Sequence, residues 1–307
     1  MAETHWNKLG AYLKETQILG SIQNTLYWDQ NTGMPKKGAS WRSEQLTYIA
    51  KVLHERNSSE EFSNLIQSAK NELSDIERNS DNQLFIKDKE RNISLLLKEF
   101  NKERNLDPQL VESLAKAKSK GYESWQEAKK KSDFKIFLPF FEELVKLRIE
   151  EAKQISIQCS PWETLAQPFE PELNLKWLNK IFQPLKETIP GLIRTINKSQ
   201  KNHWNLSPES QKNLCSKLLD EFGRDRDLVI VGQSPHPFSI TLGPNDFRIT
   251  TRIVEGEPLS SFLATAHEWG HSIYEQGLPS QSHQWFAWPL GQALSLIHIS
   301  EPTRQLQ

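Results

Sequence analysis

The sequence predicts a mostly α-helical, multi-helix protein in which a small β-sheet or hairpin precedes one further helix. Apolar residues recur at helical spacing from residue 4 to about residue 150, and the period changes to β-type alternation only between residues 228 and 253. Helical spacing then returns from about residue 259 to residue 275. With 307 residues, of which 36% are hydrophobic and 25% charged, the chain can bury a substantial core beneath solvated helix surfaces.

The N-terminal half is predicted to form consecutive helices separated by turn-forming residues. The breaks fall at Gly33-Met34-Pro35, Asn57-Ser58-Ser59, Asn79-Ser80-Asp81 and Asp107-Pro108. Ser58 and Glu61 have the spacing of a capping box, and Asp107 is a candidate N-cap before a proline at the first helical position.

One group of apolar side chains at helical spacing is predicted to belong to the core. Such a stripe is far more often packing surface than a ligand site. Its members are Phe134, Phe137, Leu138, Phe141, Leu144, Val145 and Leu147.

The second half begins with a connection, residues 158–171, which we expect to be ordered because it is not rich in Gly and Ser. Two helices are predicted at residues 174–199 and 207–222. Short strands follow at residues 228–231, 238–242 and 247–253, the last two flanking Gly243-Pro244-Asn245-Asp246. The final helix, residues 259–275, could be capped by Ser260 or Ser261.

Composition argues against several classes of function. With 38 basic and 39 acidic residues and no segregation of sign, we expect no binding to nucleic acid. The N-terminus lacks the basic and apolar regions of a signal peptide, and no apolar run approaches the roughly 20 residues that span a bilayer. Two widely separated cysteines, Cys159 and Cys215, indicate neither a thiol metal site nor a disulfide framework. We therefore expect a soluble, cytoplasmic protein without membrane contacts.

The segment His267-Glu268-Trp269-Gly270-His271 carries the most specific chemical signal. Residues four apart share one helix face, so His267 and His271 can direct two imidazoles at one metal ion. Glu268 can lie beside a water bound to that ion and act as general base, taking a proton as the water attacks a peptide carbonyl. The alternative is a pair of structural histidines.

A catalytic zinc ion needs a third protein ligand. Glu275 continues the ladder of residues four apart, but it lies about 12 Å along the helix from His267 at about 1.5 Å per residue. It is therefore excluded. His298 and Glu301 are the nearby candidates that are left.

Four segments give the chain a resemblance to the carboxypeptidase Taq family of metallocarboxypeptidases. They are Ser234-Pro235-His236-Pro237-Phe238, Asp246-Phe247-Arg248-Ile249-Thr250, the HEWGH segment with Ser272-Ile273-Tyr274-Glu275-Gln276-Gly277-Leu278-Pro279, and Tyr27-Trp28-Asp29-Gln30-Asn31-Thr32-Gly33-Met34-Pro35. The resemblance covers roughly residues 5–296. It implies a zincin-like peptidase fold and a homodimer, when full length, that removes single residues from peptide C-termini with zinc or cobalt.

The resemblance also implies roles for individual residues. His267 and His271 would be metal ligands and Glu268 the base. His236, Asp246, Arg248 and Thr250 would bind substrate by lining or bracing the cleft. Alternation puts Arg248 and Thr250 on one strand face, suited to peptide contact, but an equally good interpretation pairs Arg248 with an acidic residue of the core.

The C-terminus departs from the family pattern. We expect residues 1–296 to be the N-terminal and central part of one catalytic domain, and residues 297–307 to be an atypical, non-native tail. The family continues with a His-Glu-Ser-Gln element whose Glu is the third ligand, where this chain reads Ile297-His298-Ile299-Ser300-Glu301. Glu301 is the tentative third ligand. Because the family's later segments help to hold the substrate carboxylate, we expect activity to be incomplete in this chain. A neurolysin-type oligopeptidase and an inactive helical fragment are the alternatives.

Overall fold

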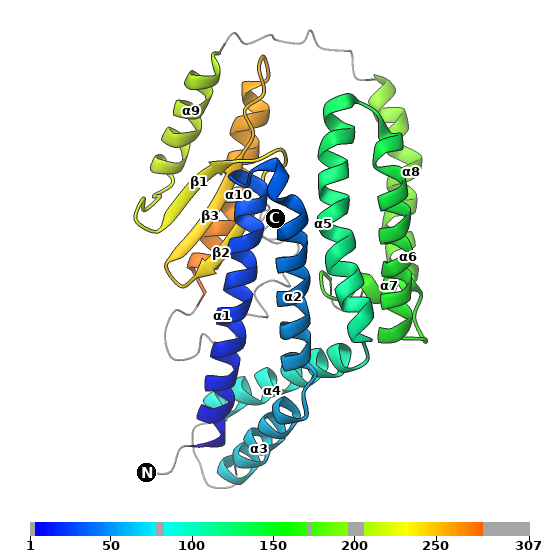
Figure 1. Ribbon diagram of the computed structural model, residues 1–307, viewed down its shortest axis with the longest axis vertical. Coiled ribbons are helices and arrows are strands. Elements are labelled where there is room, and N and C mark those ends of the chain that lie inside the picture. Colours follow the sequence, from blue (N-terminus) through cyan, green and yellow to red (C-terminus); the bar gives the residue numbers. More distant parts are fainter. Residues whose placement is uncertain (1–3, 78–82, 171–172, 196–205, 279–307) are drawn as a thin grey trace.

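The structure is a computed structural model that describes residues 4–77, 83–170, 173–195 and 206–278. Within these ranges it is predominantly helical with one small sheet (Figure 1). The helices are α1 (His5–Thr32), η1 (Lys36–Gly38), α2 (Ala39–Asn57), α3 (Glu60–Glu77), α4 (Gln83–Arg104), α5 (Pro108–Lys131), η2 (Phe134–Ile136), α6 (Leu138–Ile155), α7 (Pro161–Ala166), α8 (Leu175–Thr195), α9 (Pro208–Glu221) and α10 (Pro258–Gln276). The strands are β1 (Val229–Gln233), β2 (Ser239–Gly243) and β3 (Asp246–Thr251). The predicted fold class is confirmed.

Local capping explains where the N-terminal helices begin. Asp107 is the N-cap of α5, as predicted: its carboxylate accepts a hydrogen bond from the backbone N–H of Gln109 at 2.8 Å. The predicted capping box of Ser58 and Glu61 is wrong. Ser58 donates to the His54 carbonyl and ends α2, so Ser59 instead accepts the N–H of Phe62 at the start of α3. The predicted break at residues 79–81 lies outside the described residues.

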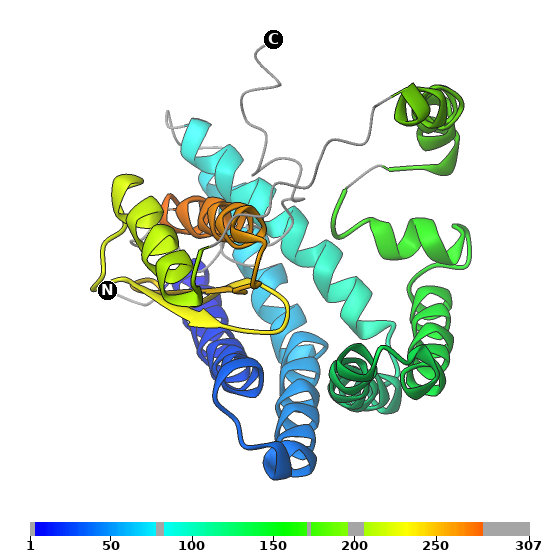
Figure 2. The ribbon, with the colours of Figure 1, turned by 90° about the horizontal axis from the view of Figure 1, so that it is seen from above.

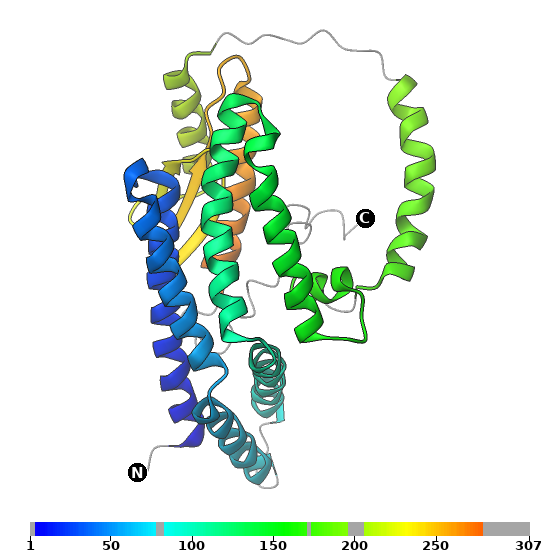
Figure 3. The ribbon, with the colours of Figure 1, turned by 45° about the vertical axis from the view of Figure 1, so that its right-hand side comes forward.

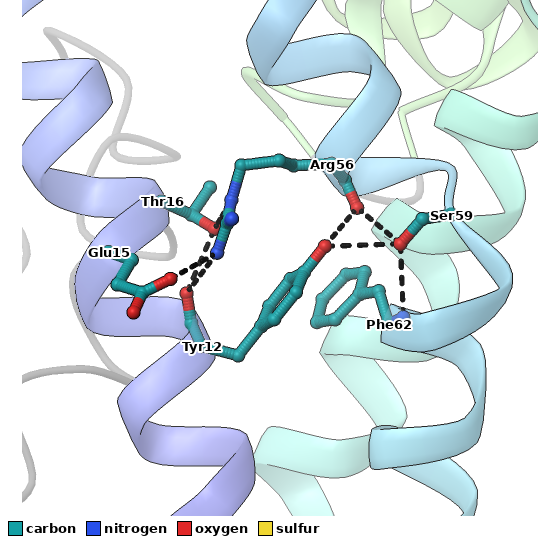
Figure 4. Close-up of polar contacts among 6 residues, drawn as sticks. All are labelled: Tyr12, Glu15, Thr16, Arg56, Ser59 and Phe62. Carbon is teal, nitrogen blue, oxygen red and sulfur yellow. Dashed lines mark hydrogen bonds and ion pairs between the residues drawn. The ribbon is translucent and has the colours of Figure 1, made fainter.

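The main helical core lies between α1, α3 and α4 and is built from Leu9, Tyr12, Leu13, Phe62, Ile66, Ala69, Leu73, Ile93, Leu96 and Phe100. Tyr12 organises its edge, with its ring stacked on Phe62 at 5.3 Å between centroids. Its hydroxyl donates to the Arg56 carbonyl at 2.8 Å, and the Arg56 guanidinium lies 4.1 Å above the same ring (Figure 4). This contact fixes α1 against the end of α2.

The sheet has the order β1-β3-β2, with β1 parallel and β2 antiparallel to the central strand β3. It lies between α1 on one face and α9 with α10 on the other (Figure 2). An apolar layer joins the sheet to these two helices. It consists of Leu219, Val229, Phe247, Ile249 and Trp269. The sequence left open a hairpin or three strands, and the structure has three.

The predicted core role of the aromatic stripe is wrong for its outer half. Phe134, Phe141 and Val145 are 58%, 44% and 41% exposed, whereas Phe137 and Leu144 are partly buried. Ser132 adopts a left-handed conformation with φ 52° and ends α5, a break that the periodicity did not reveal. Among the described elements, α6 packs chiefly on α5, η2 and α7, and several of its apolar side chains stay exposed.

The segment between α6 and α9 differs in part from expectation. Ser160 caps α7 with a complete capping box, a helix that was not predicted within the connection. Helix α8 agrees with its predicted start, but it stands apart from the other helices and has no buried residue (Figure 3). None of the described helices is long and apolar enough to cross a membrane. Cys159 and Cys215 are free thiols, as expected.

Candidate active site

Buried polar side chains connect helix α10 to the sheet and to α9. The hydroxyls of Thr265 and Thr251 are 2.7 Å apart, and the fully buried Ser261 hydroxyl donates to the Gln211 side chain of α9 at 3.0 Å. The predicted cap by Ser260 or Ser261 is wrong, because α10 begins at Pro258 and its N-cap, Glu257, makes no side-chain capping bond. These contacts fix how α10 is rotated about its axis.

With that face of α10 turned inward, His267 and His271 project from a different side of the helix. Their ring centroids are 4.9 Å apart, the rings are nearly perpendicular at 87°, and both side chains are only partly buried. Burial, and then the neighbouring His267, lower the pKa of His271. This favours the neutral imidazole, the form that binds metals.

Glu268 directly follows His267 on α10 and is only 8% exposed. Burial raises its pKa to about 7. No cation or hydrogen-bond donor among the described residues offsets that burial. A carboxylate with a pKa near neutrality is suited to exchange protons as a general base and acid.

The two imidazoles suit two coordination positions of a divalent metal ion. Within the described part of the chain, no group of three His, Cys, Asp or Glu side chains could hold such an ion. The candidates for a third ligand, His298 and Glu301, lie outside the described residues. Glu275 is described and partly buried on α10, and burial raises its pKa.

A second cluster surrounds the turn between β1 and β2. His236 at its tip is exposed, and its ring lies 6.5 Å from that of Trp125 on α5, at 90°. Phe238 makes edge contacts with Tyr27 and Trp28 of α1, at 5.8 and 5.7 Å between centroids. The turn therefore sits between α1 and α5 and presents one imidazole outward.

The structure separates the roles suggested for the β3 residues. Arg248 makes two hydrogen bonds of 2.8 Å to the Asp246 carboxylate and lies 5.6 Å above the Trp28 ring. It is thus paired with an acidic residue on the face of the sheet that meets α1. Thr250 is fully buried, so its side chain offers no surface to a substrate and fits the bracing role.

A family model describing the carboxypeptidase Taq (M32) metallopeptidases matches residues 8–302. The chain belongs to this family. The match runs past residue 296, so the expected boundary between domain and tail stays a prediction.

Named relatives of the M32 family are similar over most of this chain. It is 30% identical to thermostable carboxypeptidase 1 of Thermus thermophilus, over 97% of this chain and 60% of the relative. It is 29% identical to carboxypeptidase 1 of Bacillus subtilis, over 82% of this chain and 50% of the relative. The solved structure of BsuCP matches with a TM-score of 0.80 and 28% identity, over 89% of this chain and 55% of that one. The chain therefore spans about half to three fifths of the length of these relatives.

The sequence analysis assigned no role to several residues that shape the site of this M32 chain. Gln211 joins α9 to α10 through its hydrogen bond with Ser261. The Trp125 ring makes an edge contact with the His236 ring. Trp28 packs against Gly232 and Phe238, more than 200 positions along the chain. No local pattern marks such contacts, because each depends on how distant elements meet.

Proposed function

We propose that this chain carries the catalytic helix of a metal-dependent carboxypeptidase that removes single amino acids from peptide C-termini. The observation that supports it most is the geometry of α10: two imidazoles 4.9 Å apart with an adjacent buried carboxylate. Membership of the M32 family and the names of its relatives favour a carboxypeptidase over a neurolysin-type oligopeptidase. Peptides are the proposed substrates, acted on by the whole family chain as a cytoplasmic homodimer.

His267 and His271 would supply two ligands to one zinc ion, or to cobalt, and a further ligand such as Glu301 would complete the set. The metal would polarise the peptide carbonyl and make a water molecule more acidic. Glu268 accepts a proton from the attacking water and donates it to the leaving amine nitrogen. Burial of the Glu268 carboxyl favours its protonated form, which helps it to hold the proton between the two transfers.

Two measurements on this chain test the proposal. Zinc bound after dialysis should approach one ion per chain and fall in a His267→Ala variant. Release of the C-terminal amino acid from a blocked dipeptide should be abolished by a chelator and by Glu268→Gln, but not by Glu255→Gln, which changes an exposed carboxylate in the turn before α10.

An amidated peptide separates the two peptidase classes. A carboxypeptidase should spare it, because the free terminal carboxylate is missing, whereas an oligopeptidase should cut within it. Full activity of the Glu268→Gln protein would defeat the assignment of the base. Absence of metal binding would favour an inactive helical fragment.

A further inference from the structure

The turn that carries His236 cannot be held by ordinary strand pairing. Pro235 and Pro237 flank the histidine and have no backbone N–H to donate. Pairing resumes only where Thr250 donates its N–H to the Phe238 carbonyl at 2.8 Å. Side-chain hydroxyls must therefore supply part of the hydrogen bonding across the turn.

Two buried hydroxyls lie at the base of the turn. Thr250 is fully buried and Ser234 is 7% exposed, and their hydroxyl oxygens are 2.6 Å apart. The Phe238 N–H donates to the Thr250 oxygen at 2.9 Å, and the Ser234 hydroxyl lies 2.6 Å from the His236 carbonyl. The two hydroxyls thus connect both ends of the turn.

Each hydroxyl has one proton, and this fixes the direction of the chain of bonds. If Ser234 donates to the His236 carbonyl, its oxygen must accept from Thr250. The other possible acceptor for Thr250, the Phe238 carbonyl, is farther away at 3.4 Å. The consistent order is Phe238 N–H to Thr250, Thr250 to Ser234, and Ser234 to the His236 carbonyl, with every donor used once.

The same turn is supported from α5. Lys129 donates to the Pro235 carbonyl at 3.3 Å and lies 4.9 Å above the Trp125 ring. The His236 imidazole, beside that ring, has no hydrogen bond to any other described side chain and faces outward. The backbone around His236 is therefore firmly held while its ring is left available.

We propose that Ser234 and Thr250 are positioning residues whose paired hydroxyls hold the His236 imidazole beside Trp125 for contact with the bound peptide. The peptide contact rests on the proposed function. The positioning itself can be tested without catalysis.

The test combines nuclear magnetic resonance with substitution. With histidine-selective labelling, and the His236 signal assigned through His236→Ala, the parent protein should show a nuclear Overhauser effect between the His236 and Trp125 rings. Thr250→Val keeps the side-chain shape but leaves the Phe238 N–H without an acceptor, so this effect should be lost. Thr250→Ser keeps the hydroxyl and should retain it.

Ser234→Ala interrupts the same series of hydrogen bonds at a second position. It keeps the proposal testable if Thr250→Val fails to fold. Circular dichroism and thermal unfolding of each variant establish that the fold is intact. Retention of the His236 to Trp125 effect in folded Thr250→Val or Ser234→Ala would overturn the proposal, whether or not the chain cleaves peptides.

Kinetics add a second readout if the chain releases amino acids. Loss of positioning should lower kcat/KM by about 10–100-fold in Thr250→Val, with Thr250→Ser close to the parent. A parent chain that binds no zinc while the spectra change as expected would defeat the proposed function and leave the positioning role supported. Equal kcat/KM in the valine variant and the parent would overturn the link to substrate.

Discussion

In the metal-free protein, Glu268→Gln should raise the free energy of unfolding, and the gain should grow with pH. The folded state raises the pKa of Glu268 from its ordinary value of 4.5 to about 7. A raised carboxyl pKa means that the folded state binds a proton that the unfolded chain has released. Stability is therefore lost as pH rises from 4.5 through about 7.

The size of the effect follows from the two pKa values. At about 1.4 kcal/mol per pKa unit, their separation corresponds to a loss of stability of about 3 kcal/mol. This loss is complete above about pH 7 and absent below about pH 4.5. Because the Glu268 side chain is only 8% exposed, solvent screening reduces this little. Glutamine has nearly the same shape and no charge, so it should recover most of that energy at pH 8.

Urea unfolding in the presence of a chelator measures the difference, at pH 8 and at pH 4.5. The expected gain at pH 8 is about 3 kcal/mol, equivalent to a rise in Tm of roughly 6 °C, and it should nearly vanish at pH 4.5. The control, Glu255→Gln, alters an exposed carboxylate and should change stability by less than about 0.5 kcal/mol at either pH. A gain of the same size at both pH values, or no gain at pH 8, would refute the argument from burial.

Three further changes test other contacts. His271→Ala should weaken zinc binding, measured by calorimetry, more than about 100-fold. Loss of a residue that merely hydrogen-bonds to a metal ligand already lowers metal affinity roughly 10–100-fold. An unchanged affinity would exclude His271 as a ligand. Gly232→Ala should cost about 1–3 kcal/mol in urea unfolding because its new Cβ would meet the Trp28 ring at 2.9 Å, and Trp28→Leu should relieve much of that cost. Arg248→Lys should lower stability by about 1 kcal/mol, because an ammonium cannot reproduce the two bonds to Asp246; a value equal to the parent would show that the pair contributes nothing.

Local chemistry explains which elements were predictable. Asp107 before Pro108 marks the start of α5 because both the cap and the proline act within one turn of the chain. The spacing of apolar residues located α9 and α10, because that spacing is also set within a few turns of the chain. It failed at Ser132, where a left-handed residue that is not glycine interrupts an otherwise helical pattern. The pairing of β1 with β3 was also hidden, because a parallel register between segments that β2 separates leaves no local mark.

The sequence by itself determined the chemistry that α10 can offer. Residues four apart must share a helix face, so the spacing of His267 and His271 is enough to identify them as a pair. Tertiary structure alone decided what surrounds them: that Glu268 is buried enough for its pKa to rise, that Arg248 lies over the Trp28 ring of α1, and that the hydroxyl of Thr250 is enclosed beneath the His236 turn. Spacing along one helix is set by backbone geometry. Burial and pairing depend on segments that are far apart in the sequence and meet only in the folded chain.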